Sequence, residues 1–444
     1  MKYQSLIAIR NLKKNWRHSL AALLSITAAF FSIVVFQGYM VRVEDLYLES
    51  YRHRAMLGDL IIENRTLRTP EGKSEPWRFL ITKEEQDSIK SFLKANSDVD
   101  QHVSFLTTQG LITNGKTAVI FVGYGYDVDN GYPVRGEKWQ FNTLFGKPLT
   151  NAPSEPIPIE SQVLLGQALA RTMGCLGDPD QKIYDRDGYY YPNERSFSCK
   201  NPNIQLSGTT ISGQLNAMDL QVQGIMDAGY ADVDQRWVVM PLPTAQTLYN
   251  TDQITYMSVL LKNPNMVPRF VKAFSEQIES QHPNLKIQKW QDHMLGDLYM
   301  RTMELLSIFR NFVVIVIVSI STLSVFNTMM KIILERTREI GMLRSLGFKQ
   351  NMVRMIFVLE SLYLTVVACG IGAIFSMLFS FTVSRMGIMY KAGLLSEPIA
   401  FKILISPKAY LLSFILLMII SGITTWSVAG RILRKKIIDC LNHA

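Results

Sequence analysis

The chain has 444 residues, a formal net charge of +9 and a mean hydropathy of +0.10, and its length is too great for one ordinary domain. Both averages hide an uneven distribution, because the hydrophobic residues are concentrated in four runs of 20 to 24 residues that contain no charge. Soluble helices rarely remain uncharged on all sides over such a length, and about 20 apolar residues cross the ~30 Å hydrocarbon core of a bilayer. The composition therefore excludes an ordinary soluble protein and predicts four membrane spans. The charge-free runs are residues 19–40, 311–330, 361–384 and 409–430.

The first run follows a basic start, as the apolar core of a secretory signal peptide would. It is longer than the roughly 7–15 residues of such a core, and residues 37–40 offer no small-residue cleavage site. We therefore expect a membrane anchor that is retained. Residues 1–18, which precede it, suit an amphipathic helix on the cytoplasmic surface; a plain basic flank is the alternative.

Lysines and arginines beside the spans predict the orientation, because cytoplasmic loops carry an excess of them. The segments 1–18, 331–354 and 431–444 together contain 15 of these residues over 56 positions. The opposing segment 385–408 contains four over 24 positions. Both termini and the segment 331–354 are therefore expected in the cytoplasm, and the long block 41–307 outside. Since the basic charge is divided among membrane flanks, we expect membrane lipid and not nucleic acid as its partner.

The same reasoning sets the domain boundaries. We expect, in chain order, a cytoplasmic amphipathic helix, the first span, an extracytoplasmic domain, the second span, a cytoplasmic segment, the third span, an outer loop, the fourth span and a cytoplasmic tail. These are residues 1–18, 19–40, 41–307, 308–330, 331–354, 355–384, 385–408, 409–430 and 431–444.

The extracytoplasmic block predicts a mixed α/β domain, with two subdomains and a polar insertion near residues 175–208. Residues 81–95 suit an amphipathic helix that begins at the Thr82 cap, with Glu85 three residues later. Residues 124–160 are rich in Gly, Pro and Asn and predict loops. Strands are expected at residues 59–63, 220–226, 237–240 and 256–262.

Residues 110–117, Gly-Leu-Ile-Thr-Asn-Gly-Lys-Thr, match the phosphate-binding loop of NTPases, G-x-x-x-x-G-K-[ST]. That loop needs a helix to begin at its lysine, so that backbone N–H groups and the helix dipole face the phosphates. The residues that follow are instead β-branched and aromatic. Asn114-Gly115 between two such runs predicts a type I′ hairpin turn, so we expect a hairpin here and no nucleotide site.

Two of the four cysteines, Cys175 and Cys199, fall in the extracytoplasmic domain and flank the polar insertion. Cys369 lies in the third span and Cys440 in the tail. An oxidising compartment permits a disulfide between the first two, and closing a ~25-residue loop contributes roughly 3 kcal/mol in the chain-entropy model. Two free thiols are the alternative.

Residues with catalytic or metal-binding chemistry form no pattern in this sequence. The six histidines are scattered, and none has a neighbour at metal-ligand spacing. We expect no metal, no cofactor and no catalytic site. Glu360 near the third span could relay protons or substrate, but its position close to the cytoplasmic boundary favours a carboxylate that packs between helices.

Residues 335–347, Glu-Arg-Thr-Arg-Glu-Ile-Gly-Met-Leu-Arg-Ser-Leu-Gly, join the second and third spans and predict a helix. Ile340, Leu343 and Leu346 are spaced by three and form one apolar stripe. Gly347 is placed to end the helix as its C′ residue. A solvated charged loop is the alternative, but the stripe indicates a segment that docks against another surface.

This segment closely resembles the one after the second span in permeases of the FtsX-like superfamily. These are the type VII ABC transporter permeases, which include the macrolide exporter (MacB) and lipoprotein-release (LolCE) systems. The resemblance covers nearly the whole chain, although Cys440 stands where the closing motif of the family usually has alanine. Residues that carry it are 327–330 and 335–347, with weaker support from 6–12, 16–17, 163–170, 222–226 and 438–441.

The resemblance implies an α+β membrane protein in which a large mixed α/β extracytoplasmic domain lies between transmembrane helices 1 and 2. It implies a non-catalytic permease that works as a dimer, with a second copy or a paralogue, and with two copies of a separate cytoplasmic ABC ATPase. That ATPase would bind ATP and Mg. The coupling helix in residues 331–354 would contact it, and the expected coupling residues are Glu335, Arg336, Arg338, Glu339, Met342 and Arg344.

Such a permease transmits ATP-driven motion to its extracytoplasmic domain in order to extrude or release a substrate. The substrate classes of the family are lipoproteins, lipids, peptides and drugs, and a periplasmic adaptor or carrier protein serves as partner in some systems. The expected location is the bacterial inner membrane. The alternatives are an FtsX-like regulatory protein that controls an extracytoplasmic enzyme, and a membrane-anchored receptor without an ATPase.

Overall fold

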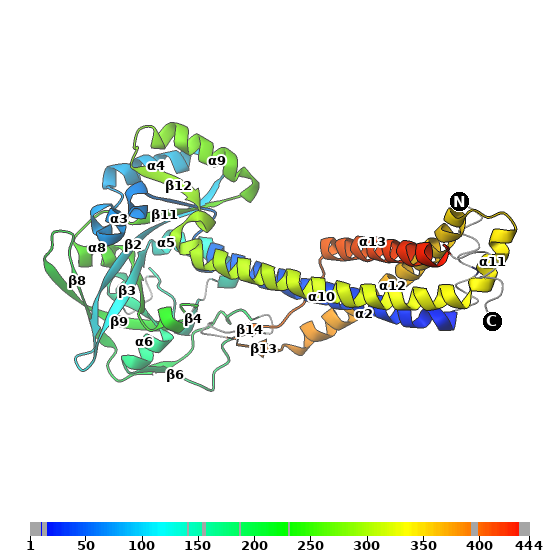
Figure 1. Cartoon of the computed structure of the whole chain (residues 1–444). Coiled ribbons are helices and arrows are strands. Elements are labelled where there is room, and N and C mark those ends of the chain that lie inside the picture. Colours follow the sequence, from blue (N-terminus) through cyan, green and yellow to red (C-terminus); the bar gives the residue numbers. More distant parts are fainter. Residues whose placement is uncertain are drawn as a thin grey trace. The chain divides into compact units, whose positions relative to one another are not determined.

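The computed structural model describes residue 10 and residues 16–139, 142–152, 157–185, 188–229, 231–391 and 398–434. The chain divides into two compact units (Figure 1). The helical unit comprises Met1–Asp45, Thr302–Ile388 and Phe401–Ala444, and the mixed domain comprises Leu46–Arg301 and Met389–Ala400. The closing motif at 438–441 and most of the amino-terminal helix expected at 1–18 lie outside the described residues.

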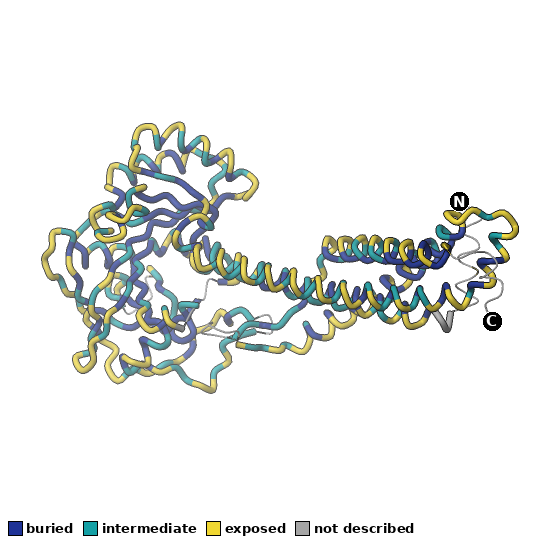
Figure 2. The backbone as a smooth tube through the Cα atoms, in the orientation of Figure 1, coloured by how far each residue is buried: buried dark blue, intermediate teal, exposed yellow. Residues whose placement is uncertain are grey.

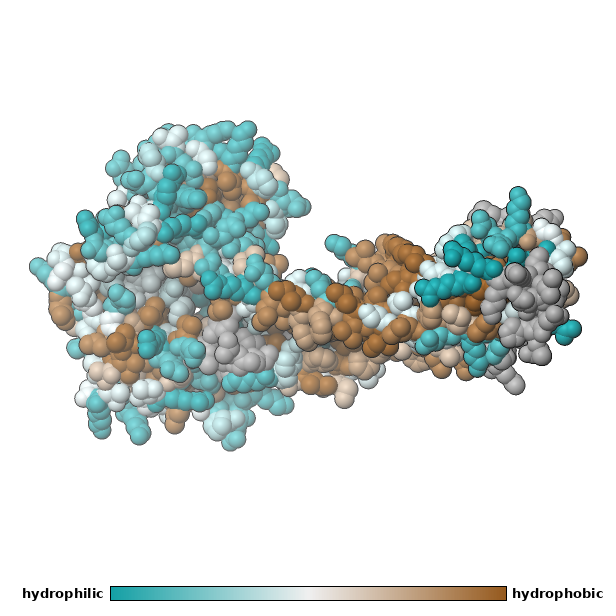
Figure 3. Space-filling view, in the orientation of Figure 1, coloured by the Kyte–Doolittle hydropathy of each residue, from teal (hydrophilic) through white to brown (hydrophobic). Residues whose placement is uncertain are grey.

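Four long helices in the described part of the chain are apolar enough to cross a membrane, which confirms the four predicted spans. Their apolar side chains gather along the surface of the helical unit (Figure 3). Many of these side chains on one helix, such as Ile308, Ile315 and Leu323, are exposed, as expected of residues that face lipid or another subunit. The four helices are α2 (Trp16–Glu49), α10 (Asp297–Glu335), α12 (Gln350–Met386) and α13 (Pro407–Ile432).

Close approach and hydroxyl groups hold these helices together. A Cβ atom added at Gly372 of α12 would lie 3.0 Å from Phe30 Cδ1 and 3.1 Å from the Thr27 carbonyl oxygen of α2. Elsewhere along α12, the Ser361 hydroxyl is hydrogen-bonded to that of Ser421 in α13. Small residues and short polar groups are the usual means by which helices associate where lipid removes the hydrophobic driving force.

The mixed domain is built on a ten-stranded sheet with the order β12-β1-β11-β2-β3-β10-β5-β9-β4, and β8 pairs with β2 and β9. Neighbouring strands are antiparallel except for the parallel pairs β3–β10 and β5–β9. Its strands are β1 (Leu60–Asn64), β2 (Val99–Thr113), β3 (Ala118–Tyr126), β4 (Thr143–Gly146), β5 (Gln162–Gly166), β8 (Asn203–Thr209), β9 (Leu215–Met226), β10 (Trp237–Pro241), β11 (Tyr256–Leu261) and β12 (Leu285–Lys289).

Three clusters of buried hydrophobic residues cover different parts of this sheet, and one of them contains Phe105, Tyr126 and Trp290. Around β1, β11 and β12, the helices α4 (Lys83–Ala95) and α9 (Val267–Phe274) contribute buried residues such as Phe92 and Phe270. Further along, α6 (Gln167–Thr172) and α8 (Leu242–Tyr249) pack on the strands of a second core. The central strands are accordingly buried along much of their length (Figure 2). The short helices α3 (Pro70–Ser74) and α7 (Ala231–Asp234) complete the domain.

The predicted start of α4 is confirmed, and the prediction of loops over residues 124–160 is wrong in part. The Thr82 hydroxyl accepts a hydrogen bond from Glu85 N, and the Glu85 carboxylate accepts one from Thr82 N, so the expected capping box begins α4. Residues 124–160 are not all loop, because they contain the end of β3, α5 (Val128–Trp139) and β4. Pro133 lies inside α5, and Gly136 interrupts it with φ of 62°, so its sequence resembles that of a loop.

The stretch that matches a phosphate-binding loop forms the β2–β3 hairpin, as predicted. A strand, and not a helix, follows Lys116, so the geometry required by that motif is not formed. The predicted type I′ turn at Asn114-Gly115 is wrong, because Gly115 has φ of 85° whereas Asn114 does not adopt a positive φ. The Asn114 side-chain oxygen instead accepts hydrogen bonds from the backbone N–H groups of Lys116 and Thr117.

The predicted disulfide between Cys175 and Cys199 is present. It joins two facing residues of a small separate sheet formed by β6 (Cys175–Gly177) and β7 (Phe197–Cys199). Buried Arg195 donates hydrogen bonds to the carbonyl oxygens of Thr143 and Leu144 and so attaches the insertion to β4. A further short pair, β13 (Met389–Tyr390) with β14 (Ile399–Ala400), belongs to the mixed domain although it lies between α12 and α13 in sequence.

We expect that the denatured, non-reduced chain has two thiols that react with a maleimide, and four after reduction. The double variant Cys175→Ser/Cys199→Ser should show two under both conditions and should be less stable by roughly 3 kcal/mol, because its unfolded state is less restricted. Mass spectrometry counts the labels and thermal unfolding in detergent measures stability. Four reactive thiols in the non-reduced chain would refute the disulfide.

Candidate functional site

The segment between the second and third long helices, residues 331–354, is the candidate coupling segment. Helix α10 ends at Glu335, and α11 (Thr337–Ser345) begins after Arg336, whose φ of −102° and ψ of 17° break the helix. The Thr337 hydroxyl donates a hydrogen bond to the Leu334 carbonyl oxygen and so satisfies one of the last acceptors of α10. The predicted helix is therefore present, and it is separated from α10 by a single residue.

Gly347 ends α11 as predicted. Its φ of 92° lies in the left-handed region, its N–H donates to the Arg344 carbonyl, and the N–H of Phe348 donates to the Leu343 carbonyl. These two bonds define a Schellman motif, in which a residue in the left-handed conformation satisfies the last carbonyls of a helix. Because Leu343 and Phe348 both pack against one hydrophobic cluster, the chain turns sharply towards α12.

A buried ion pair fixes α11 to α12. Arg336 donates to Glu360 Oε2 at 3.0 Å and to Glu339 Oε2 at 2.8 Å, and its guanidinium lies 5.2 Å from the centre of the Phe357 ring. The side chains of Arg336 and Glu360 are 12% and 4% exposed. Glu360 therefore has the helix-packing role that its position predicted.

The apolar stripe is divided between two surroundings. Ile340 is buried and Leu343 is partly buried, and both pack with residues of α10, α12 and α13 such as Ile333 and Val353. Leu346, the third member, is 76% exposed. Two of the three residues that were expected to form a docking stripe thus attach α11 to its own membrane helices.

The six predicted coupling residues fall into two groups. Arg336 is held in its ion pair, and Arg344 donates to the Leu433 carbonyl at 3.2 Å next to the end of α13, so both attach the segment to the bundle. The other four are exposed. Together with Leu346, which was predicted as part of the apolar stripe and not as a coupling residue, they form what we call the outer face: Glu335, Arg338, Glu339, Met342 and Leu346.

Residues 311–437, which include α11, α12 and α13, match the family described as FtsX-like permease C-terminal. This part of the chain is therefore similar to the C-terminal part of FtsX-like permeases. It is also 40% identical over 65 residues to the ABC transporter permease YtrF of Bacillus subtilis (strain 168), a match that spans 15% of this chain and 15% of that protein. The family resemblance noted from the coupling segment is thereby confirmed for residues 311–437.

Solved structures with similarity to this chain include two domains of transporters. The extracellular domain of the noncanonic ABC-type transporter YknZ from Gram-positive bacteria aligns with a TM-score of 0.33 at 11% identity, over 52% of this chain and 98% of that one. The periplasmic region of MacB from Actinobacillus actinomycetemcomitans aligns with a TM-score of 0.34 at 14% identity, over 56% and 92%. Both TM-scores are below 0.5.

We expect Arg336→Ala to destabilise the helical unit by about 3–5 kcal/mol, because it leaves the Glu360 carboxylate buried without its partner. Thermal unfolding in detergent measures the change. The matched control Arg338→Ala removes an exposed arginine of the same segment and should change stability by less than about 0.5 kcal/mol. Equal effects of the two substitutions would show that the ion pair contributes nothing specific.

Proposed function

We propose that this chain is the permease subunit of an ABC transporter that transmits ATP-driven motion of a separate cytoplasmic ATPase to the mixed domain. One observation carries the proposal. Helix α10 is continuous from Asp297, within the mixed domain, to Glu335, one residue before α11. A displacement of α11 would therefore move α10, and the other end of α10 belongs to the mixed domain, which would act on the substrate.

The outer face supports contact with a partner protein. Met342 and Leu346 are 55% and 76% exposed, and the charged residues Glu335, Arg338 and Glu339 surround them. Exposed apolar side chains with a polar rim are typical of protein interfaces. Because Ile340 and the Arg336–Glu360 pair fix the opposite side of α11 to the bundle, force applied to the outer face would reach α10 and α12 directly.

The proposed orientation places α11 and both termini in the cytoplasm of a bacterial cell and the mixed domain outside its inner membrane. The excess of lysine and arginine in residues 331–354 supports it. The disulfide between Cys175 and Cys199 supports it independently, since disulfides persist in oxidising compartments.

The proposed assembly contains two permease chains, as two copies or as paralogues, and two ATPase subunits that bind ATP and Mg. Along α10, exposed residues such as Ile308, Phe312 and Ile315 provide an apolar surface for lipid or for the second permease chain. The proposed substrates are those of the family, namely lipoproteins, lipids, peptides or drugs, and a periplasmic adaptor or carrier protein would receive them.

Charge placed on the outer face should prevent coupling. Met342→Glu should lower the amount of ATPase that copurifies with the affinity-tagged permease at least about tenfold, since burying an unpaired carboxylate in an interface is costly. The thermal transition of the permease should not change, because Met342 is exposed. Leu215→Glu, at an exposed position of β9 in the mixed domain, is the control. Full copurification of the ATPase with Met342→Glu would contradict the proposed contact.

The orientation has its own test. In right-side-out spheroplasts of a Cys440→Ser strain, a membrane-impermeant maleimide should label Leu215→Cys and should not label Leu346→Cys. Disruption of the membrane should make both react, because both positions are exposed in the fold. Labelling of Leu346→Cys in intact spheroplasts would place α11 outside and overturn the proposed direction of coupling.

A further inference from the structure

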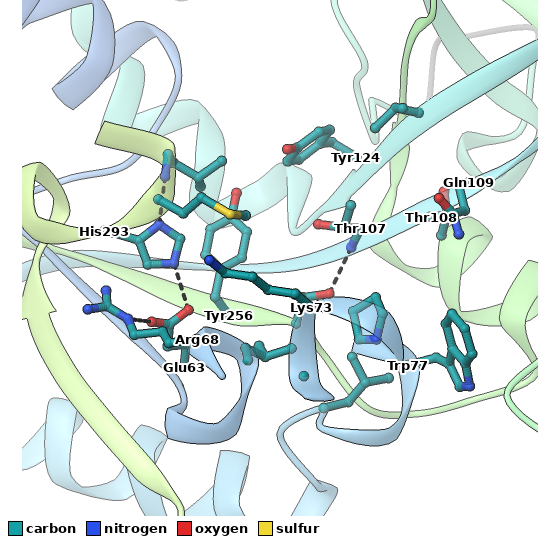
Figure 4. Close-up of a pocket in the computed structure, with 18 of the residues that line it drawn as sticks. Glu63, Arg68, Lys73, Trp77, Thr107, Thr108, Gln109, Tyr124, Tyr256 and His293 are labelled. Carbon is teal, nitrogen blue, oxygen red and sulfur yellow. Dashed lines mark hydrogen bonds and ion pairs between the residues drawn. The ribbon is translucent and has the colours of Figure 1, made fainter. Parts of the chain in front are cut away.

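The mixed domain contains a cavity of about 620 Å³ that the coupling mechanism does not use (Figure 4). Its walls come from the sheet strands β2, β3 and β11, from the segment 67–80, and from residues 292–297 immediately before and at the start of α10. The volume falls within the roughly 300–1,000 Å³ of small-molecule sites. The lining includes the aromatic side chains of Trp77, Tyr124, Tyr249 and Tyr256.

Two of these aromatic rings are well placed for a flat ligand. Trp77, from the 3₁₀ turn Pro76–Arg78, is 39% exposed and projects from one wall. Tyr124 lies on β3 and stacks on Trp237 with ring centres 4.3 Å apart, which fixes its orientation. Burial raises the pKa of Tyr124 to about 12, so its phenol stays neutral at physiological pH and remains a hydrogen-bond donor.

Glu63 is the most buried acidic side chain of the lining, and hydrogen-bond donors of the protein already balance the charge of its carboxylate. It accepts hydrogen bonds from Arg68 Nε at 2.7 Å, from Gln288 Nε2 at 2.8 Å and from His293 Nε2 at 2.7 Å. Burial alone would raise the pKa of Glu63, but the His293 and Arg68 contacts outweigh it and lower that pKa below its usual value. His293 Nδ1 accepts from Leu295 N, so the Nε2 N–H is the donor to Glu63.

The remaining carboxylates of the lining, those of Asp292 and Asp297, also have positive charge or a helix N-terminus nearby. Asp297 lies in the first turn of α10, where the helix dipole favours negative charge. The backbone oxygen of Asp292 accepts from Arg68 Nη2 at 3.1 Å, so a guanidinium lies beside that residue. Lys73 differs, because its ammonium group makes no hydrogen bond or ion pair with any described residue. Figure 4 shows Lys73 between the Glu63–Arg68–His293 group and Trp77.

We propose that this cavity binds an amphipathic anion with an aromatic body. The anionic group pairs with the Lys73 ammonium, and the aromatic body stacks against Trp77 and Tyr124. Since Met294 and Leu295 belong to the same lining, the bound ligand contacts the residues that lead into α10. The site requires neither the ATPase nor transport activity, so its test is separate from that of the proposed function.

The test uses the full chain in lipid nanodiscs without ATPase, with naphthalene-2-sulfonate and its cationic counterpart 2-naphthylmethylammonium as probes. Saturation-transfer NMR measures the affinity for each probe, with empty nanodiscs as background. We expect the sulfonate to bind about tenfold more tightly than the amine, as one charge-assisted contact permits. Lys73→Gln should abolish the preference for the sulfonate, and Trp77→Ala should lower the affinity for both probes.

Lys116→Gln, in the exposed turn of the β2–β3 hairpin, removes an equal charge outside the cavity and should leave both affinities unchanged. Equal affinity for the two probes, an unchanged preference in Lys73→Gln, or a signal no larger than that of empty nanodiscs would each overturn the proposal. If Trp77→Ala lowers the midpoint temperature of thermal unfolding, Lys73→Gln still decides the outcome, because Lys73 is exposed and its substitution should not affect folding.

Discussion

The ion pair between Arg336 and Glu360 is the contact on which the candidate coupling segment depends. Arg336 occupies the single position between α10 and α11, so its side chain sets the angle at which one helix follows the other. Its carboxylate partner is on α12 and nearly fully buried, where an unpaired charge would be costly. One contact therefore joins three helices, while Met342 and Leu346 remain exposed.

A second buried carboxylate has the corresponding role at the other end of α10. Glu63 on β1 accepts from His293, whose other ring nitrogen accepts the N–H of Leu295. The turn Met294–Gly296 that precedes Asp297 is thereby attached to the sheet. Helix α10 thus has a charged or polar anchor within each unit, as a helix that conveys motion would need. The proposed anion cavity adjoins the anchor in the mixed domain.

Much of this arrangement could be predicted from the sequence where the signal is local. Charge-free runs predict spans, Thr82 with Glu85 predicts the start of α4, and Gly347 predicts the end of α11. Spacing also identified the stripe of Ile340, Leu343 and Leu346, but periodicity shows that residues share a face and not what covers it. Only the fold shows that the first two pack within the chain and that Leu346 does not. Helix α5 was missed because its Pro133 and Gly136 are typical of loops, and the cavity because its walls are distant in sequence.

The short pair β13–β14 groups with the mixed domain and not with the helices that it connects. The chain therefore passes between the two units four times, after Asp45, Arg301, Ile388 and Ala400. Two of these passages are made by unbroken helices, α2 and α10, whereas α12 ends at Gly387, with φ of 60°, before the third. The connection thus combines two continuous helices with two short non-helical segments. Continuous helices can transmit rotation and axial displacement. Connecting segments of fixed length limit the amplitude of those movements.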